Sequence, residues 1–487
     1  MITVHQRLAA VAVIICLLPN CAPWNKPTRA VGKSSESRTL PGDSACLQSH
    51  RSVGPNYGCS FIEFDGKGGF LDFDQYTGAQ QRLKKLKAHS NVLLVIYCHG
   101  WNNNSQSADV IRFMSFLRRL ADSAYIQRKD LHVEGVYLGW RGSQYLPVIA
   151  QADLSADPKL TQDFDGELLV DSKWQLPGPI GALMSPAKYL SYWSIKDRGE
   201  FHVSRVPLSR AVFGLAFTLK TPEDANRGRH HRVFVLGHSF GALVLEQAIG
   251  QASVGLLTSE WIRDQREARW PIDLIVFLNS AAPSLYAKQL KEFLQDDHRA
   301  SARPRIVSLT STGDWATGLL HPIGNFGNRF SVDLQRKYHP EGKDKPAVTA
   351  GEYYALTPGH NPHLIDHVVK PDPDIQPPDE IANDDDKVFS KNLDPIKPPE
   401  SPDVFFARSS KDNRVYAWQL RDLNAGYRKG VHPSNYWIGS VPKDIIRDHG
   451  DIWSAASMEM LAGIYRLTET LEKQSPPSLQ APVLKQD

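Results

Sequence analysis

Short apolar runs recur along the chain, and most of them lack the polar alternation of a strand that has one face in water. Val, Ile, Leu and Phe follow one another in these runs, which is typical of strands covered on both faces. We predict strands at residues 92–97, 135–138, 233–236, 274–278, 306–309 and 436–440.

Helical patterns lie between several of these runs. A charged segment precedes the first run, and segments with a helical spacing of apolar residues follow others. We predict helices at residues 79–88, 108–121, 242–252, 286–294 and 452–466. Strands and helices that alternate along a chain form a mostly parallel sheet with helices on both faces. The expected fold class is therefore α/β, in a domain of residues 59–470.

Two long segments interrupt this alternation. Residues 143–230 separate two predicted strands and contain several aromatic residues, so we expect a cap over the strand ends. Residues 371–403 hold eight of the 33 prolines beside a run of three aspartates, and we expect a disordered loop there. Residues 22–58 and 471–487 are polar, and we expect a lead-in and a C-terminal tail.

The N-terminal residues 1–21 have the pattern of an export signal. Residues 8–18 are apolar but too few to span a bilayer, and Cys21 follows them. The arrangement resembles a bacterial lipoprotein signal, whose cysteine is acylated, although Pro19 and Asn20 stand where that signal usually has small residues. The resemblance implies a cell-envelope protein anchored to the membrane through Cys21. The alternatives are a retained anchor or ordinary cleavage, which would give a periplasmic or secreted protein.

The composition is that of an ordinary globular protein. Of 487 residues, 41% are hydrophobic and 22% are charged, which excludes wholesale disorder, collagen-like structure and a multi-pass membrane protein. The formal net charge is +3 without a long basic run, so we expect no nucleic-acid partner. The five cysteines form no CxxC pair. In an oxidising compartment Cys46 and Cys59 are disulfide candidates, and the alternative is two free thiols.

The strongest chemical signal is the segment 237–241, Gly-His-Ser-Phe-Gly, which has the pattern GxSxG. A predicted buried strand runs into it and a helix rich in small residues runs out of it, which is the context of a nucleophile elbow. Ser239 is then the nucleophile in a strained turn, next to His238. Gly237 and Gly241 lack side chains that would collide with neighbouring elements. The alternative is a strand-to-helix turn without chemistry.

A second signal lies at the end of the first predicted strand, where His99 and Gly100 precede Trp101. A His-Gly turn at this position directs a backbone N–H at the nucleophile and supplies half of an oxyanion hole. The expected donors are the backbone amides of Trp101 and Phe240. We expect the side chain of His99 to brace the loop by hydrogen bonding, and not to act in catalysis.

Together these motifs resemble the α/β-hydrolase superfamily. More narrowly, they are similar to bacterial serine hydrolases that pair a His-Gly-Trp strand end with a Gly-His-Ser-Phe-Gly elbow. The resemblance covers about residues 60–345 and 430–470, including 61–68 and 135–141. It implies an α/β-hydrolase fold, with a mostly parallel central sheet and a cap insertion. It also implies a catalytic triad, and it implies no particular substrate.

The acid of such a triad follows a later strand, and the histidine lies near the C-terminus. Asp314 follows the predicted strand at 306–309 in a Gly-containing turn, so we expect it to be the acid, with Asp366 and Asp403 as rivals. Its role would be to accept the imidazole Nδ1–H and to fix the tautomer. His449 follows the last predicted strand in a His-Gly turn, so we expect it to be the base that takes the Ser239 proton.

A competing set of residues is His360, His363, Asp366 and His367. Spacings of three and four put the last three on one face of a helix, with His360 just before it, which would suit zinc. Clustered histidines are more often polar loop residues. We therefore expect no metal and no cofactor.

The sequence predicts a serine hydrolase that works through an acyl-enzyme, most simply on carboxylic esters as esterases and lipases do. The expected partner is a small-molecule or lipid-like ester substrate. The aromatic cap and the membrane location favour lipid-like or acyl esters over small polar ones. Two alternatives stay open. The same triad serves amidases and acyltransferases, and a catalytically silent hydrolase fold would serve as a binding protein of the envelope.

Overall fold

The computed structural model describes residues 57–101, 103, 105, 107–123, 131–142, 195–221, 224, 229–258, 270–295, 304–325, 335–338, 347–381, 385–393, 403–423 and 435–474. The predicted signal at 1–21 with Cys21, the disulfide candidate Cys46 and much of the predicted cap lie outside these residues. Those predictions stay predictions.

Ten strands of the described chain form one sheet, in the order β1-β3-β2-β4-β5-β6-β12-β9-β11-β10. Neighbours from β1 to β9 in this order are parallel, whereas β11 and β10 run antiparallel to their neighbours. The fold is therefore α/β with a mostly parallel sheet, as predicted. The strands are Tyr57–Glu63 (β1), Asn91–Cys98 (β2), Leu131–Gly139 (β3), Arg232–His238 (β4), Leu274–Leu278 (β5), Ile306–Ser311 (β6), His367–Pro371 (β9), Val404–Arg408 (β10), Val415–Asp422 (β11) and Tyr436–Val441 (β12).

Helices connect most of the parallel strands. The main ones are Phe73–His89 (α3), Ala108–Asp122 (α4), Val206–Leu219 (α8), Phe240–Thr258 (α10), Ser284–Gln295 (α12), Asp385–Leu393 (α15) and Ala455–Gln474 (α16). Shorter elements are η6 (Gly199–Val203), η7 (Ala316–Leu320), α13 (His321–Asn325), α14 (Ala350–Ala355), η10 (Pro358–His360), η11 (Asp379–Ile381) and the two-stranded pair β7 (Lys337–Tyr338) and β8 (Val348–Thr349). All six predicted strands and all five predicted helices are present, with shifted ends.

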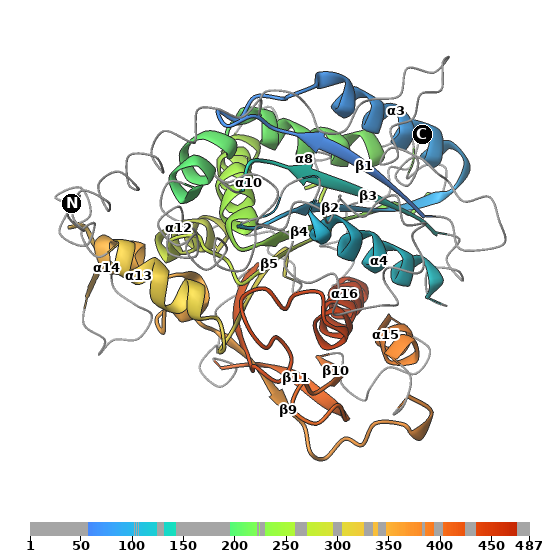
Figure 1. The fold of residues 1–487 in the computed structure, drawn as a ribbon, viewed down its shortest axis with the longest axis vertical. Coiled ribbons are helices and arrows are strands. Elements are labelled where there is room, and N and C mark those ends of the chain that lie inside the picture. Colours follow the sequence, from blue (N-terminus) through green and yellow to red (C-terminus); the bar gives the residue numbers. More distant parts are fainter. Residues whose placement is uncertain are drawn as a thin grey trace, which may run out of the picture.

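Helices cover both faces of the sheet (Figure 1). In β2 the residues Leu94, Ile96 and Cys98 join a core cluster with α3, α8, α10 and α12, while Val95 and Tyr97 join a second cluster with α4, α15 and α16. Successive side chains of a strand point to opposite faces, so a strand without polar alternation must be covered on both. This is the physical reason why the apolar runs predicted the strands.

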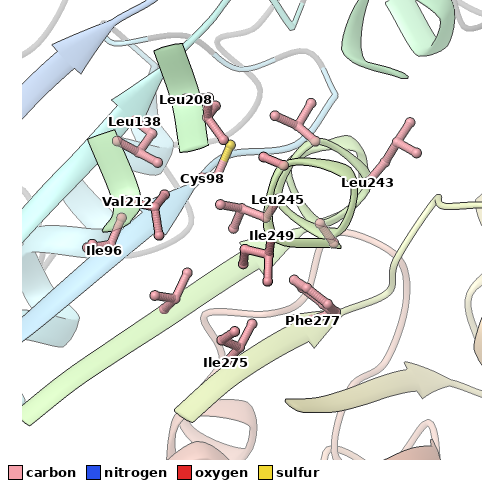
Figure 2. Packing of buried hydrophobic residues seen from close by; sticks show 14 of the residues in the cluster. Ile96, Cys98, Leu138, Leu208, Val212, Leu243, Leu245, Ile249, Ile275 and Phe277 are labelled. Carbon is pink, nitrogen blue, oxygen red and sulfur yellow. The ribbon is translucent and has the colours of Figure 1, made fainter. Parts of the chain in front are cut away.

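The larger core cluster lies between the sheet and the helices α8 and α10. Figure 2 shows Leu245 and Ile249 of α10 near Ile275 and Phe277 of β5. Cys98 lies in the same cluster, where burial raises the pKa of its thiol well above the usual range. A thiol that stays protonated takes no part in nucleophilic chemistry.

The helix α8 corrects part of the predicted cap at 143–230. Its residues Leu208, Val212 and Leu215 are buried in the larger core cluster, and the helix packs against α3 and α10. It therefore covers a face of the sheet as the connection between β3 and β4, which are both parallel neighbours of β2. An apolar helical stretch was assigned to the cap because the length of the segment hid this connection.

The predicted disordered loop at 371–403 is wrong over much of its length. Within it, η11 and α15 are ordered, and Val388, Phe389 and Leu393 of α15 are buried. The helix packs against α16 and β10. Proline content indicated an unfolded segment, but three apolar residues at helical spacing suffice to bury one face of a short helix.

Smaller boundaries also differ from the predictions. Strand β1 begins at Tyr57, inside the predicted lead-in 22–58, and α16 continues to Gln474, inside the predicted tail 471–487. Cys59 is buried in β1 with its Sγ 3.7 Å from the carbonyl oxygen of Ser60. Within the described part of the chain, no helix is both long enough and apolar enough to cross a membrane.

Candidate active site

The turn between β4 and α10 has the geometry expected of an elbow. Ser239 has φ of 56°, in the left-handed region that non-glycine residues rarely occupy. Its backbone N–H donates to the carbonyl of Leu278 at 3.0 Å, and its carbonyl accepts from Ala242 and Ala281 at 3.1 and 3.2 Å. These bonds to α10 and to the segment after β5 hold the strained conformation in place.

The glycines on either side of Ser239 are required by close packing. A Cβ on Gly237 would lie 2.8 Å from Cα of Ala242, and one on Gly241 would lie 2.1 Å from the carbonyl oxygen of Cys98. Backbone atoms at these distances cannot yield as a flexible side chain can. The prediction that both glycines remove collisions is confirmed, and it explains how the chain turns sharply enough to present Ser239.

Ser239, His449 and Asp314 form one hydrogen-bonded chain. The Ser239 Oγ lies 2.6 Å from Nε2 of His449, and Nδ1 of His449 lies 2.9 Å from Oδ1 of Asp314. With Nδ1–H donating to the carboxylate, Nε2 accepts the serine proton. Ser239 is 1% exposed, and the side chains of His449 and Asp314 are 13% and 0% exposed.

Asp314 and His449 meet because their strands are neighbours. β6 and β12 pair in parallel with Ser311 opposite Val441, so the loops that follow them leave the same edge of the sheet. The N–H of Thr312 donates to the carbonyl of Val441 at 2.8 Å, which joins the starts of the two loops. The sequence separation of 135 residues between acid and base is thereby closed by one strand pair.

The surroundings of Asp314 keep its carboxylate charged. Burial alone would raise its pKa, but the nearby His449 and hydrogen bonds from His449 and Thr317 outweigh burial and lower the pKa. The backbone N–H groups of Ala316 and Thr317 donate to Oδ1 at 3.0 and 3.1 Å, and the Thr317 hydroxyl donates to Oδ2. An ionised, fixed carboxylate is what holds an imidazole in one tautomer.

Two side chains donate to the backbone carbonyl of His449, and the sequence predicted neither contact. Nε2–H of His238 donates to the His449 carbonyl at 2.8 Å, and Nδ2–H of Asn279 donates to the same oxygen at 3.0 Å. Asn279 is itself fixed, because its Oδ1 accepts from the Ser311 N–H at 2.9 Å. Its φ of 47° is a conformation that asparagine tolerates, and an Asn directly after an apolar run was the one available signal.

His238 is neutral at physiological pH. Burial, followed by repulsion from His449, lowers its pKa to about 4. Its proton sits on Nε2, because a carbonyl oxygen can accept but not donate. The residue between Gly237 and Ser239 is therefore a donor that holds the loop of His449.

The His-Gly turn after β2 packs directly on Ser239. A Cβ on Gly100 would lie 2.7 Å from Cβ of Ser239, so the turn touches the nucleophile. His99 donates through Nδ1 to the Gly100 carbonyl at 3.0 Å and accepts at Nε2 from the Trp140 N–H at 3.0 Å. The expectation that His99 braces the loop is confirmed. Trp101 follows this turn.

Phe240, the other expected oxyanion donor, is the first residue of α10. Its backbone N–H therefore belongs to the first turn of that helix, where N–H groups have no partner within the helix. Phe240 is buried, and its place directly after Ser239 puts both residues at the same edge of the sheet as the turn at Gly100.

The alternative metal set does not come together. His360 ends η10, with Nδ1 3.0 Å from the Thr357 hydroxyl, while His367 begins β9, with Nδ1 2.6 Å from Asp366. His363 lies in an exposed turn between them. The expected helical face is absent, because η10 ends at His360 and β9 begins at His367. No group of three or more His, Cys, Asp or Glu residues in the described ranges is arranged to hold a metal ion.

The rival acids have other partners. Asp366 is buried and accepts from Lys291 Nζ and His367 Nδ1, both at 2.6 Å. Asp403 accepts from the side chain of Gln419 at 2.7 Å. Asp314 is therefore the acid that the fold brings to His449.

A buried carboxylate supports the catalytic loop from the other face of the sheet. Asp109 accepts hydrogen bonds from the hydroxyls of Tyr97 and Tyr137 at 2.8 and 3.1 Å, and from Nε1–H of Trp453 at 2.7 Å. Trp453 lies four residues after His449, so α4 and the catalytic loop are joined at Asp109. Sequence reasoning missed this link, because its members are far apart along the chain.

Comparisons with known proteins name no relative. No protein-family model matches the chain, and no curated protein matches it. The function is therefore inferred from the geometry of the site.

Proposed function

We propose that the protein is a serine hydrolase with the α/β-hydrolase fold and that it cleaves carboxylic esters. One observation carries the proposal, the hydrogen-bonded chain from Ser239 through His449 to Asp314. It is supported by the strained turn at Ser239 and by the order of serine, acid and histidine along a mostly parallel sheet.

In the first half of the reaction, Ser239 Oγ attacks the ester carbonyl while Nε2 of His449 takes its proton. Asp314 stabilises the imidazolium that forms. The backbone amides of Trp101 and Phe240 are the proposed donors to the oxyanion, since one follows the turn packed on Ser239 and the other begins α10. Loss of one such donor typically costs roughly 100- to 1,000-fold in rate.

The first half ends when His449 gives its proton to the leaving alcohol, which departs and leaves an acyl-enzyme on Ser239. In the second half His449 takes a proton from water, whose oxygen attacks the acyl carbon. The bond from the acyl carbon to Ser239 Oγ then breaks, His449 returns the proton to Oγ, and the carboxylic acid leaves. A silent binding fold has no need for a complete and oriented triad, so the contacts of His449 favour an enzyme over the binding-protein alternative.

The test is labelling of the intact protein with a fluorophosphonate probe, followed by mass-spectrometric mapping of the modified residue. We expect the label on Ser239, and its loss in Ser239→Ala and His449→Ala. The control is His363→Ala, which removes an exposed histidine and should leave labelling unchanged. Ester hydrolysis should fall by several orders of magnitude in Ser239→Ala. Unlabelled wild-type protein, or a Ser239→Ala variant within tenfold of wild type, would exclude the mechanism.

A further inference from the structure

Two arginines without a role in the proposed triad lie next to residues that pack on the Gly100 turn and on α10. Arg141 follows β3 and Trp140, and Arg198 comes directly before η6. Both are partly buried. Partly buried arginines next to a reacting centre are a frequent means of binding carboxylate or phosphate groups.

The position of Arg141 is fixed by its two chain neighbours. Trp140 donates its backbone N–H to Nε2 of His99 at 3.0 Å and its ring N–H to the His99 carbonyl at 2.9 Å. A Cβ on Gly142 would lie 2.8 Å from the carbonyl oxygen of Gly100. Arg141 is therefore held between two residues that touch the turn packed on Ser239.

Arg198 reaches the same place from another element. A Cβ on Gly199 would lie 3.5 Å from the ring of Trp140 and 3.2 Å from Cγ2 of Val244, which belongs to the second turn of α10. Arg198, which directly precedes Gly199, is thus close to Trp140 and to α10.

Among the residues that the structure describes, Arg198 has no ion-pair partner. Its Nη1 is buried and has no hydrogen-bond partner in the structure. Burial lowers the pKa of Arg198, and burial together with repulsion from Arg198 lowers the pKa of Arg141 to about 10. The two positive charges therefore lie close enough to repel each other. An uncompensated buried donor is costly, which points to a ligand that completes it.

Two carboxylates near Arg198 are engaged with other groups. One is Asp65, whose turn approaches Arg198: a Cβ on Gly66 would lie 3.8 Å from Nε of Arg198. The Asp65 carboxylate accepts from the backbone N–H groups of Lys67 and Gly69 at 2.8 and 2.9 Å.

Glu200, two residues after Arg198, is also committed. It binds Lys196 through Oε2, and it accepts from the hydroxyls of Tyr286 and Tyr354 at Oε1. Its charge is therefore balanced by Lys196, and it does not neutralise Arg198.

We propose that Arg141 and Arg198 bind an oxyanion carried by the substrate, so that the enzyme prefers esters bearing a carboxylate or phosphate group over neutral esters. This inference rests on the proposed hydrolase function. The planar guanidinium presents paired N–H groups that match both carboxylate and phosphate, and it donates without ever giving up its proton at neutral pH.

The test compares matched anionic and neutral esters. On the acyl side these are 4-nitrophenyl hydrogen adipate and 4-nitrophenyl methyl adipate, and on the alcohol side 3-acetoxybenzoate and its methyl ester. For each pair we measure kcat/KM in wild type, Arg198→Gln and Arg198→Lys. Dividing the anionic-to-neutral ratio of wild type by that of the variant cancels the intrinsic reactivity of the esters.

We expect this double ratio to be at least about tenfold for Arg198→Gln in one pair, because a charge-assisted bidentate contact is lost. Arg198→Lys keeps the charge and should recover part of it. The control is Arg421→Gln, an exposed arginine of β11 at the far end of the sheet, which should give a ratio of one. A ratio of one for Arg198→Gln in both pairs overturns the proposal.

A second measurement separates this inference from the hydrolase proposal and identifies the source of the oxyanion. Titration calorimetry with 3-acetoxybenzoate on Ser239→Ala, with and without Arg198→Gln, detects binding even if the wild type hydrolyses nothing. Assays with an anionic phospholipid in mixed micelles distinguish a lipid headgroup from a small soluble acid. Binding that is unaffected by Arg198→Gln, combined with ester ratios of one, would refute the anion site while leaving fluorophosphonate labelling of Ser239 intact.

Discussion

The position of His449 is fixed at its backbone carbonyl as well as at its imidazole ring. His238 and Asn279, from the ends of β4 and β5, both donate to the carbonyl of His449, while its side chain bridges Ser239 and Asp314. The backbone of the catalytic residue is thus held as firmly as its ring. Small displacements of a catalytic group from its reactive geometry are expensive, since about 1 Å can cost 100-fold in rate.

We expect Asn279→Gly to lower kcat by roughly 10- to 100-fold with KM little changed, because the donor is lost while binding surfaces stay in place. Glycine accepts the φ of 47° without strain, so the variant removes the amide and not the backbone conformation. The matched control is Asn413→Gly, which has φ of 58° in an exposed hairpin between β10 and β11.

The decisive measurement for Asn279 is steady-state kinetics alongside thermal unfolding. A kcat within twofold of wild type, at equal folded fraction, would mean that the clamp on His449 is not needed. If Asn413→Gly lowers kcat by the same factor, the cause is the introduction of glycine and not the loss of the Asn279 amide.

At this scale the sequence predicted the residues whose chemistry follows from their type and position. Ser239, Asp314 and His449 each follow an apolar run at a strand end, so all three lie at one edge of a parallel sheet. His238 and Asn279 gave no comparable signal. Their role depends on which strands become neighbours, and that is decided by packing across the whole sheet.

At the scale of elements, α15 shows how a few buried side chains outweigh composition. Phe389 is 1% exposed and contacts the ring of Phe116 in an edge-to-face arrangement, with the guanidinium of Arg119 5.0 Å from its ring centre. Val388 faces a small separate cluster with β10 and β11. The helix therefore joins α4 to the antiparallel end of the sheet.

We expect Phe389→Ala to lower the free energy of unfolding by about 3 kcal/mol, through lost burial and the cavity left behind. The measurement is denaturant unfolding at 25 °C. The control is Lys387→Ala, an exposed position of the same helix, which should change stability by less than about 0.5 kcal/mol. If Phe389→Ala changes the free energy of unfolding as little as Lys387→Ala does, the packing of α15 does not stabilise the fold.

Elements that the sequence did not predict share a physical cause. β10 and β11 follow the predicted loop at 371–403, and neither was among the predicted strands. α8 was assigned to a cap because a long segment, residues 140–231, separates β3 from β4. In both cases the periodicity of the segment predicts its secondary structure but not the element, remote in the sequence, against which it packs.

Across the molecule as a whole, several histidines are buried in the neutral state. Nδ1 of His231 accepts from the Val92 N–H at 3.1 Å, and burial is the main cause that lowers the pKa of His231 to about 4. His238 has its pKa lowered to about 4 in the same way, and that of His321 lies well below 6.5. Acid should therefore destabilise the fold.

Between pH 6.5 and about 4 the unfolded chain binds a proton at His231 that the folded chain does not, so the free energy of unfolding falls as the pH falls. This one residue should cost about 2 kcal/mol at pH 5 relative to pH 7. His231→Gln should flatten the dependence of the melting temperature on pH over this window.

Melting temperatures of wild type, His231→Gln and the exposed control His89→Gln between pH 7 and 5 test this expectation. Asp224 Oδ1 lies 4.0 Å from Nε2 of His231 and acts to raise its pKa, so the direction of the pH dependence shows whether burial outweighs this carboxylate. Parallel curves for wild type and His231→Gln would show that His231 is charged in the folded state.

The place of β12 between β6 and β9 has a consequence for the order in which the protein acquires activity. As a ribosome releases the chain, Ser239 and Asp314 emerge on strands that can already pair, whereas His449 arrives with the last strand of the sheet. β12 must insert beside a strand made more than a hundred residues earlier, a closure that is slow because it is non-local. In the proposed mechanism, Ser239 therefore lacks its base until β12 and the loop that carries His449 have been made.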